Sequence, residues 1–127
     1  MKLLLDTHVL VWWLEDPRRL SRRAATILAN RDNDILISAA VGWEIAIKVG
    51  VGKMKPRSIL QDLDRVLAEE AFSELPITLD AAVRAGLLPL HHRDPFDRLL
   101  IAQATEENLT LVSRDKAFRA YDVARVW

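Results

Sequence analysis

Short apolar runs alternate along the chain with segments of helical periodicity. Three runs have the length and flanking residues of buried strands: residues 3–5, 34–38 and 109–113. Residues 72–78 predict a weaker strand or a loop, and residues 123–127 a last strand. Strands that alternate with helices favour an α/β fold, in which helices cover both faces of a parallel sheet.

Two helical patterns lie between the strands at residues 3–5 and 34–38, and a third follows the strand at residues 34–38. A short helix is predicted at residues 9–14, and a second helix begins at Ser21. Ser38 is expected to be the N-cap of an apolar helix at residues 39–50.

Two further helices carry end signals of their own. Ser58 and Gln61 have the spacing of a capping box, in which two side chains satisfy the first free N–H groups of a helix. The single helix expected behind Ser58 carries apolar residues on one face, namely Ile59, Leu60, Leu63, Val66 and Leu67. Asp80 is expected to cap a short helix that Gly86 ends.

The bulk composition fits one ordinary globular unit. The chain has 127 residues and half of them are apolar, so a single domain over residues 1–127 is predicted. It has no cysteine, which excludes disulfides and thiolate zinc sites and fits a reducing, cytoplasmic location. The apolar N-terminal stretch is interrupted by Asp6 and His8, so neither export nor membrane insertion is expected.

The formal net charge is zero, so the chain as a whole is not a polycation. Any contact with nucleic acid therefore has to come from local basic clusters. Three such clusters are Arg18, Arg19, Arg22 and Arg23; Lys53, Lys55 and Arg57; and His91, His92 and Arg93. For any one cluster alone, a solvated surface without a partner is the favoured interpretation.

Acidic side chains stand where two of the predicted strands end. Asp6 directly follows the strand at residues 3–5, and Asp115 comes two residues after Ser113, the last residue of the strand at 109–113. In open parallel sheets, ligands bind outside the carboxyl ends of the strands. Because aspartate is also common in turns, the position of either acid is informative only together with the other acids.

Glu44 is the least expected acid, because it lies in an otherwise apolar helix. Within residues 39–52 the only charged side chains are Glu44 and Lys48, and a helix that is apolar nearly all round is buried on several sides. A buried carboxylate has to be paired or bind a metal. An i,i+4 pair with Lys48 contributes only about 0.2–0.5 kcal/mol in an isolated helix, so we favour a functional role for Glu44.

The helix predicted at residues 94–108 begins with two acids, Asp94 at the N-cap and Asp97 at N3. An acid at N3 stabilises a helix by roughly 0.3–1 kcal/mol through the helix dipole. The next residues on the same face, Ile101 and Ala104, are apolar, so Asp97 is expected to point into packed structure or a cleft. Asp94 is interpreted mainly as the cap, with a secondary part in the site.

Asp6, Glu44, Asp97 and Asp115 come from four segments that can meet at one edge of the sheet. Carboxylates about 4 Å apart repel by roughly 4 kcal/mol per pair at an effective dielectric near 20, so protons or cations have to lie between them. Oxygen ligands without cysteine select Mg²⁺ or Mn²⁺. These ions suit the hydrolysis of phosphodiesters by metal-activated water, which needs no side-chain nucleophile.

Four stretches resemble, in order and spacing, the PIN-domain ribonucleases of bacterial type II toxin–antitoxin modules, the VapC-like toxins. They are "LLLDTHVLVWWL", "ISAAVGWEIAIKVGVGKM", "LPLHHRDPFDRLLIAQA" and "LTLVSRD", and together they span nearly the whole chain. The resemblance matches the family's acidic residues to Asp6, Glu44, Asp97 and Asp115, as catalytic residues and metal ligands. It adds Thr7 and Ser113 as accessory polar groups.

This resemblance also carries expectations about the whole protein. It implies a PIN-like α/β/α sandwich with a central parallel sheet of about five strands. It implies an endoribonuclease that depends on Mg²⁺ or Mn²⁺, acts on RNA and forms a homodimer. It further implies inhibition by a cognate small antitoxin whose tail occupies the active-site groove.

Several alternatives remain open at this point. An aspartate-based phosphatase would use Asp6 as nucleophile but usually needs a second acid two residues later, where this chain has His8. A phosphoreceiver domain needs an adjacent acidic pair after the first strand, which "LLLDT" lacks. A nuclease that acts on DNA would use the same metal site, and a non-catalytic PIN-fold binding module is disfavoured by the complete set of acids.

Histidines and tryptophans are the remaining candidates. Beside four carboxylates, His91 and His92 are not expected to be metal ligands; contact with an RNA phosphate and a loop position without a special role are equally open. Core or dimer contacts are expected for most tryptophans, although their rings are able to stack bases. The tryptophans are Trp12, Trp13, Trp43 and Trp127.

Overall fold

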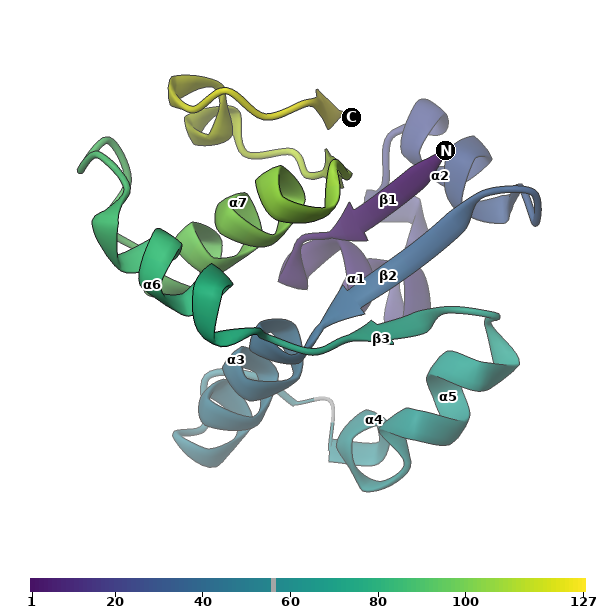
Figure 1. Cartoon of the computed structure of the whole chain (residues 1–127). Helices are drawn as coiled ribbons and strands as arrows, with labels where there is room; N and C mark the ends of the chain where they lie inside the picture. Colours follow the sequence, from purple (N-terminus) through teal and green to yellow (C-terminus); the bar gives the residue numbers. More distant parts are fainter. Residues whose placement is uncertain (56) are drawn as a thin grey trace.

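The centre of the molecule is a five-stranded parallel sheet with strand order β3-β2-β1-β4-β5 (Figure 1). The computed structural model describes residues 1–55 and 57–127, without the side chain of Arg57, a member of the second basic cluster. Each neighbouring pair of strands is parallel. The strands are β1 (Lys2–Leu5), β2 (Asp34–Ser38), β3 (Ser73–Leu75), β4 (Thr110–Val112) and β5 (Arg125–Val126).

Helices cover the sheet on both sides, which confirms the expected α/β/α sandwich. Figure 1 shows α1 and α2 behind the sheet, and α6 and α7 packed together on another side. The helices are α1 (Thr7–Glu15), α2 (Arg22–Ala29), α3 (Ala39–Gly50), α4 (Arg57–Gln61), α5 (Leu63–Glu69), α6 (Leu79–Leu87) and α7 (Pro95–Glu107), with 3-10 turns η1 (Pro17–Arg19) and η2 (Lys116–Ala120). Within the described residues, none of these helices is long and apolar enough to cross a membrane.

The core explains why β1 is an uninterrupted apolar run. Leu3, Leu4 and Leu5 are all fully buried, because β1 is central in the sheet and side chains on both of its faces are covered. Leu4 lies between Leu36 of β2 and Leu111 of β4 in the register of the sheet. Each such leucine stabilises the fold by roughly 1.5–3 kcal/mol relative to an exposed position.

The predicted caps Ser38 and Asp94 are confirmed by hydrogen bonds, and Ser21, predicted to begin a helix, is the N-cap of α2. The Ser21 side chain accepts from the Ala24 N–H, and the Ser38 side chain accepts from the Ala40 N–H. The Asp94 carboxylate accepts from the N–H groups at positions 96 and 97. The first helix begins at Thr7 rather than at position 9, so it follows Asp6 directly.

The predicted capping box at Ser58 is wrong. Ser58 lies inside α4, after Arg57, and one predicted helix is divided into α4 and α5. The division falls at Asp62, whose φ of −148° is not helical. The Asp62 carboxylate instead pairs with the Arg65 side chain, at 2.5 Å between Oδ2 and Nε.

Both end signals predicted for α6 are also wrong. Thr78, not Asp80, is the N-cap, because the Thr78 side chain accepts from the Ala81 N–H while Asp80 lies in the first turn. Thr78 also bonds to Glu106 of α7, which favours it as the cap. Gly86 lies within the helix, which ends one residue later at Leu87.

The topology places a crevice beside β1. The chain runs from β1 to β2 and β3 on one side, then returns to β4 and β5 on the other side of β1. The strand order therefore reverses between β1 and β4. In open α/β sheets, ligands bind at such a reversal, outside the carboxyl ends of the strands.

Candidate active site

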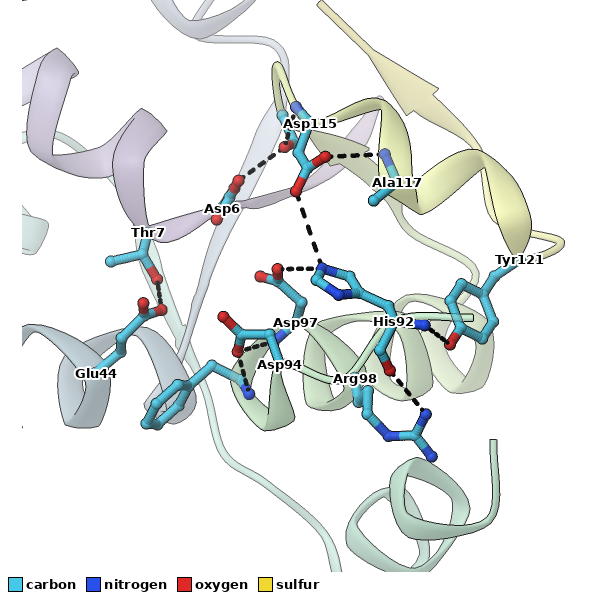
Figure 2. A network of polar contacts seen from close by, with 12 residues as sticks. Asp6, Thr7, Glu44, His92, Asp94, Asp97, Arg98, Asp115, Ala117 and Tyr121 are labelled. Carbon is cyan, nitrogen blue, oxygen red and sulfur yellow. Dashed lines mark hydrogen bonds and ion pairs between the residues drawn. The ribbon is translucent and has the colours of Figure 1, made fainter. Parts of the chain in front are cut away.

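The four predicted acids come together at this reversal. Asp6, Glu44, Asp97 and Asp115 all line one cavity of about 720 Å³, together with Asp94. Figure 2 shows these carboxylates around a common space, with Asp6 from the end of β1, Glu44 from α3, Asp97 from α7 and Asp115 from the loop after β4. The predicted convergence of the four segments is therefore found in the structure.

Asp6 is held at the end of β1 by main-chain and side-chain bonds. Its N–H donates to the Val112 carbonyl of β4, and its Oδ2 accepts a 2.7 Å hydrogen bond from the Ser113 hydroxyl. Only 8% of Asp6 is exposed. Burial raises the pKa of Asp6, although the Ser113 hydrogen bond and the nearby His8 act in the opposite direction.

Glu44 is paired on both oxygens. The Thr7 hydroxyl donates to Glu44 Oε1 at 2.6 Å, and the Lys48 ammonium lies 2.7 Å from Glu44 Oε2. The pairing that we considered as the structural explanation of Glu44 is thus present. The hydrogen bond from Thr7 connects Glu44 to the first residue of α1, which directly follows Asp6.

The Asp97 carboxylate, like that of Asp6, has a raised pKa. Burial, followed by the negative charges of Asp6 and Asp94, raises the pKa of Asp97 to about 7. A hydrogen bond to His92 partly offsets this shift. The expectation that Asp97 points into a cleft is correct, because its side chain is only 13% exposed and lines the cavity.

His92 lies inside the acidic cluster, which the sequence analysis missed. His92 Nε2 lies 2.7 Å from Asp97 Oδ2 and 3.9 Å from Asp115 Oδ2 (Figure 2). One ligand atom from each of these three residues falls within 4.8 Å of the others, a spacing that suits a metal ion. The sequence did contain a signal, because His92 is only five residues from Asp97. The presence of four carboxylates nevertheless made a histidine ligand unexpected.

The loop that carries His92 is fixed by a buried arginine. Arg98 of α7 is 7% exposed, and its guanidinium donates to the carbonyls of Leu88, Pro89 and His92, and of Gly86. The His92 N–H in turn donates to the Tyr121 hydroxyl. Sequence reasoning did not single out Arg98, although a basic residue between Asp97 and an apolar helix face was a usable signal.

The tryptophans differ in their surroundings. Trp12 is buried, and Trp13 donates from Nε1 to Glu70 while packing on the core. Trp127 also packs against the core, as expected. Trp43 is the exception, since 57% of it is exposed and it contacts the ring of Phe96 edge-on.

Comparison with known proteins identifies the family. Residues 3–124 match the family model described as the PIN domain. The chain belongs to the PIN-domain family. This PIN domain is 33% identical over 120 residues to ribonuclease VapC22 of Mycobacterium tuberculosis, a match that covers 93% of this chain and 90% of that protein. The resemblance to VapC-like toxins seen in the sequence is therefore confirmed.

Solved structures agree on the fold. One is the VapBC2 complex of Rickettsia felis bound to a promoter DNA fragment, with a TM-score of 0.72 and 23% identity over 99% of this chain and 98% of the other. Another is the DNA-bound VapBC complex of Salmonella typhimurium, with a TM-score of 0.73 and 15% identity over 99% and 97%. At these identities the likeness concerns the fold. The phosphatase and phosphoreceiver alternatives are disfavoured by the match of residues 3–124 to the PIN domain.

Proposed function

We propose that this PIN domain is the toxin of a type II toxin–antitoxin module and hydrolyses phosphodiester bonds of RNA with the help of Mg²⁺ or Mn²⁺. The observation that carries the proposal is the meeting of Asp6, Glu44, Asp97 and Asp115 in one cavity. The name of the Mycobacterium tuberculosis relative, a ribonuclease, supports the reaction.

The donor atoms of the cavity suit a hard divalent ion. Asp6, Asp97 and Asp115 offer carboxylate oxygens, which Mg²⁺ and Mn²⁺ prefer. The pKa of Asp97, about 7, reflects burial and the negative charge of its neighbours. A cation among these groups would offset both effects, so the residues fit the ion.

Each acid has a proposed part in holding that ion. Asp6 faces the cavity from the end of β1, Asp97 from α7, and Asp115 from the loop after β4. Glu44 completes the set from α3, with Thr7 and Lys48 orienting its carboxylate. Ser113 orients Asp6, and Asp94 fixes the start of α7 so that Asp97 faces the cavity.

When bound, Mg²⁺ or Mn²⁺ supplies the positive charge that makes a water molecule acidic enough to attack a phosphodiester at neutral pH. The acids hold the ion in place, and the sheet and α7 keep their side chains in fixed positions. His92 orients the Asp97 carboxylate through a 2.7 Å hydrogen bond from the ring atom Nε2, which also lies 3.9 Å from Asp115 Oδ2.

Partners follow from the same family. The solved relatives named VapBC are toxin–antitoxin complexes, which supports a small antitoxin as the partner of this chain. The proposed RNA substrate and antitoxin partner are both consistent with a cytoplasmic location.

An exposed apolar face on and after α6 supports the proposed homodimer, because such patches commonly mark protein contacts. Its members are Leu79, Val83, Leu87 and Leu90, with exposed fractions of 83%, 54%, 80% and 78%.

A cleavage assay tests the proposal. The purified protein is incubated with single-stranded RNA and with DNA of the same sequence, with Mg²⁺, with Mn²⁺ or with EDTA. RNA is expected to be cleaved only with added metal, and Asp97→Asn is expected to abolish cleavage while the far-UV circular dichroism is unchanged. Cleavage that persists in EDTA would reject the mechanism. Cleavage of DNA alone would favour the DNA nuclease, and no cleavage of either would favour the non-catalytic binding module.

A further inference from the structure

Two arginines rest on one buried tryptophan at the cavity. The guanidinium carbon of Arg19 lies 4.7 Å from the ring centroid of Trp12, and that of Arg114 lies 5.2 Å from it. Trp12 is 6% exposed and packs against Trp127, with 5.9 Å between the ring centroids. Arg19, Trp12 and Arg114 all line the same cavity as the acids.

The main chain holds both arginines in place. Arg19 ends the η1 turn, where its N–H donates to the Asp16 carbonyl and the following residue, Leu20, is buried. Arg114 directly follows Ser113, which is fully buried and bonded to Asp6. Two loops far apart in the sequence therefore place the main chain of both arginines beside the acidic cluster, and Trp12 contacts their guanidinium groups.

Three other basic side chains near the site are already engaged, whereas Lys116, which also lines the cavity, is exposed. Lys48 is paired with Glu44, Arg98 donates to main-chain carbonyls, and Arg125 donates to the Ser113 carbonyl at 2.6 Å. Among the residues that the structure describes, the guanidinium groups of Arg19 and Arg114 have neither a hydrogen-bond acceptor nor an ion-pair partner. Their N–H donors are free to bind an anion at the cavity.

We propose that Arg19, Trp12 and Arg114, here called the Trp12 clamp, bind backbone phosphates of single-stranded RNA next to the bond that is cut. This inference rests on the proposed function. A guanidinium binds two phosphate oxygens in its plane and also stacks on an aromatic face, so both contacts are compatible. Stacking on Trp12 restricts the arginines before RNA binds, which reduces the conformational entropy lost on binding.

The charges of the cavity separate the Trp12 clamp from the acidic cluster. The floor of the cavity is acidic, with Asp6 and Asp97, whereas the free cations of the clamp lie over α1 and the loop after β4. Phosphates that flank the reacting one are therefore held on the α1 side of the cavity. Because Trp12 is buried under both arginines, the clamp reads the backbone and not the bases, and its contribution is independent of RNA sequence.

The salt dependence of RNA binding tests the clamp. A fluorescent single-stranded RNA is titrated with Asp97→Asn protein, which does not cut it, at fixed Mg²⁺ and several salt concentrations. Arg19→Gln and Arg114→Gln are introduced singly and together in this background. The matched control is Arg18→Gln, because Arg18 is in the same turn but has a 92% exposed side chain that pairs with Asp16.

Each phosphate contact on a single strand contributes about 0.7 to the slope of log K against log salt concentration. The single clamp variants are therefore expected to reduce the slope by about 0.7, and the double variant by about 1.4. The Arg18 control is expected to keep the slope. In protein that retains Asp97, the clamp variants are expected to raise KM for RNA.

Several outcomes would overturn the clamp. One is an unchanged slope in the double variant, whether or not the unaltered protein cleaves RNA. Another is the absence of RNA binding by the Asp97→Asn protein. Weakened binding of the antitoxin with unchanged RNA binding would assign the two arginines to a protein partner and would likewise refute it. Failure of metal-dependent cleavage, in contrast, refutes the proposed function and is read from a separate assay.

Discussion

The Ser113 hydroxyl donates a 2.7 Å hydrogen bond to Asp6 Oδ2, across 107 positions of the chain. The two residues follow neighbouring parallel strands, β4 and β1, at the point where the strand order reverses. Ser113 Oγ also accepts from the Asp115 N–H at 3.0 Å. One buried hydroxyl therefore fixes the relative positions of two acids of the candidate site.

Replacing Ser113 by alanine is expected to lower the free energy of unfolding by roughly 1–3 kcal/mol, because buried polar groups lose their partner. Urea denaturation of Ser113→Ala measures this loss. The matched control is Ser73→Ala on β3, which is exposed and is expected to change stability by less than about 0.5 kcal/mol. Equal effects of the two substitutions would show that the Ser113 bond does not tie the site together.

The raised pKa of Asp97 predicts an unusual pH dependence of the metal-free protein. Because the pKa rises from 3.8 to about 7 on folding, the folded state binds more protons than the unfolded state between these values. Stability in EDTA is therefore expected to fall as the pH increases from about 4 to about 7. Asp97→Asn removes the titrating group, so it is expected to raise the melting temperature at pH above 7 more than at pH 4.

Thermal melts in EDTA at several pH values measure this difference. Asp122→Asn is the control, since Asp122 is exposed on the surface and its substitution is expected to give a small change that does not depend on pH. A gain for Asp97→Asn that is the same at every pH would contradict the electrostatic explanation.

The sequence predicted the parts of this structure that depend on local periodicity and on strand ends. Asp6 and Asp115 were assigned to the ligand-binding edge because parallel strands share the direction of their carboxyl ends, and the structure places both there. Asp97 followed from the apolar residues on its helix face. These inferences needed only the pattern within each segment and one rule of sheet topology.

The missed features depend on contacts between segments. His92 enters the cluster because Arg98 and Tyr121 hold its loop, and the sequence does not indicate which groups of that loop these two side chains contact. Thr78 replaced Asp80 as a cap because it also bonds to Glu106 of a neighbouring helix. The break at Asp62 is an exception, because among the ion pairs of the described residues Asp62 pairs only with Arg65, three residues later.

Arg98 is expected to be essential for the loop that carries His92. Arg98→Met leaves four carbonyl groups without their donor, so it should lower the free energy of unfolding by at least about 2 kcal/mol. Arg98→Lys keeps the charge but not the planar guanidinium, so its free energy of unfolding should lie between those of the unaltered protein and Arg98→Met. The control is Arg84→Met, because Arg84 makes only a 3.4 Å surface pair with Asp80, worth about 0–1 kcal/mol.

Chemical denaturation ranks these three variants. A loss for Arg98→Met no greater than that for Arg84→Met would show that the loop is held by other contacts.

Metal binding is expected to stabilise the folded chain. Mn²⁺ binds the folded state through acids that are scattered in the unfolded chain, so it should raise the melting temperature in a concentration-dependent way. Asp6→Asn should reduce this shift, whereas Asp122→Asn should leave it intact. A shift of equal size in the Asp6 variant would remove Asp6 from the ligands.

Crystals soaked in Mn²⁺ and measured for anomalous scattering test the central claim most directly, because they locate the ion itself. The expected result is a peak in the cavity, within coordination distance of carboxylate oxygens of both Asp6 and Asp97. A crystal that binds Mn²⁺ only elsewhere, or that shows no peak in the cavity at saturating Mn²⁺, would contradict a shared metal site.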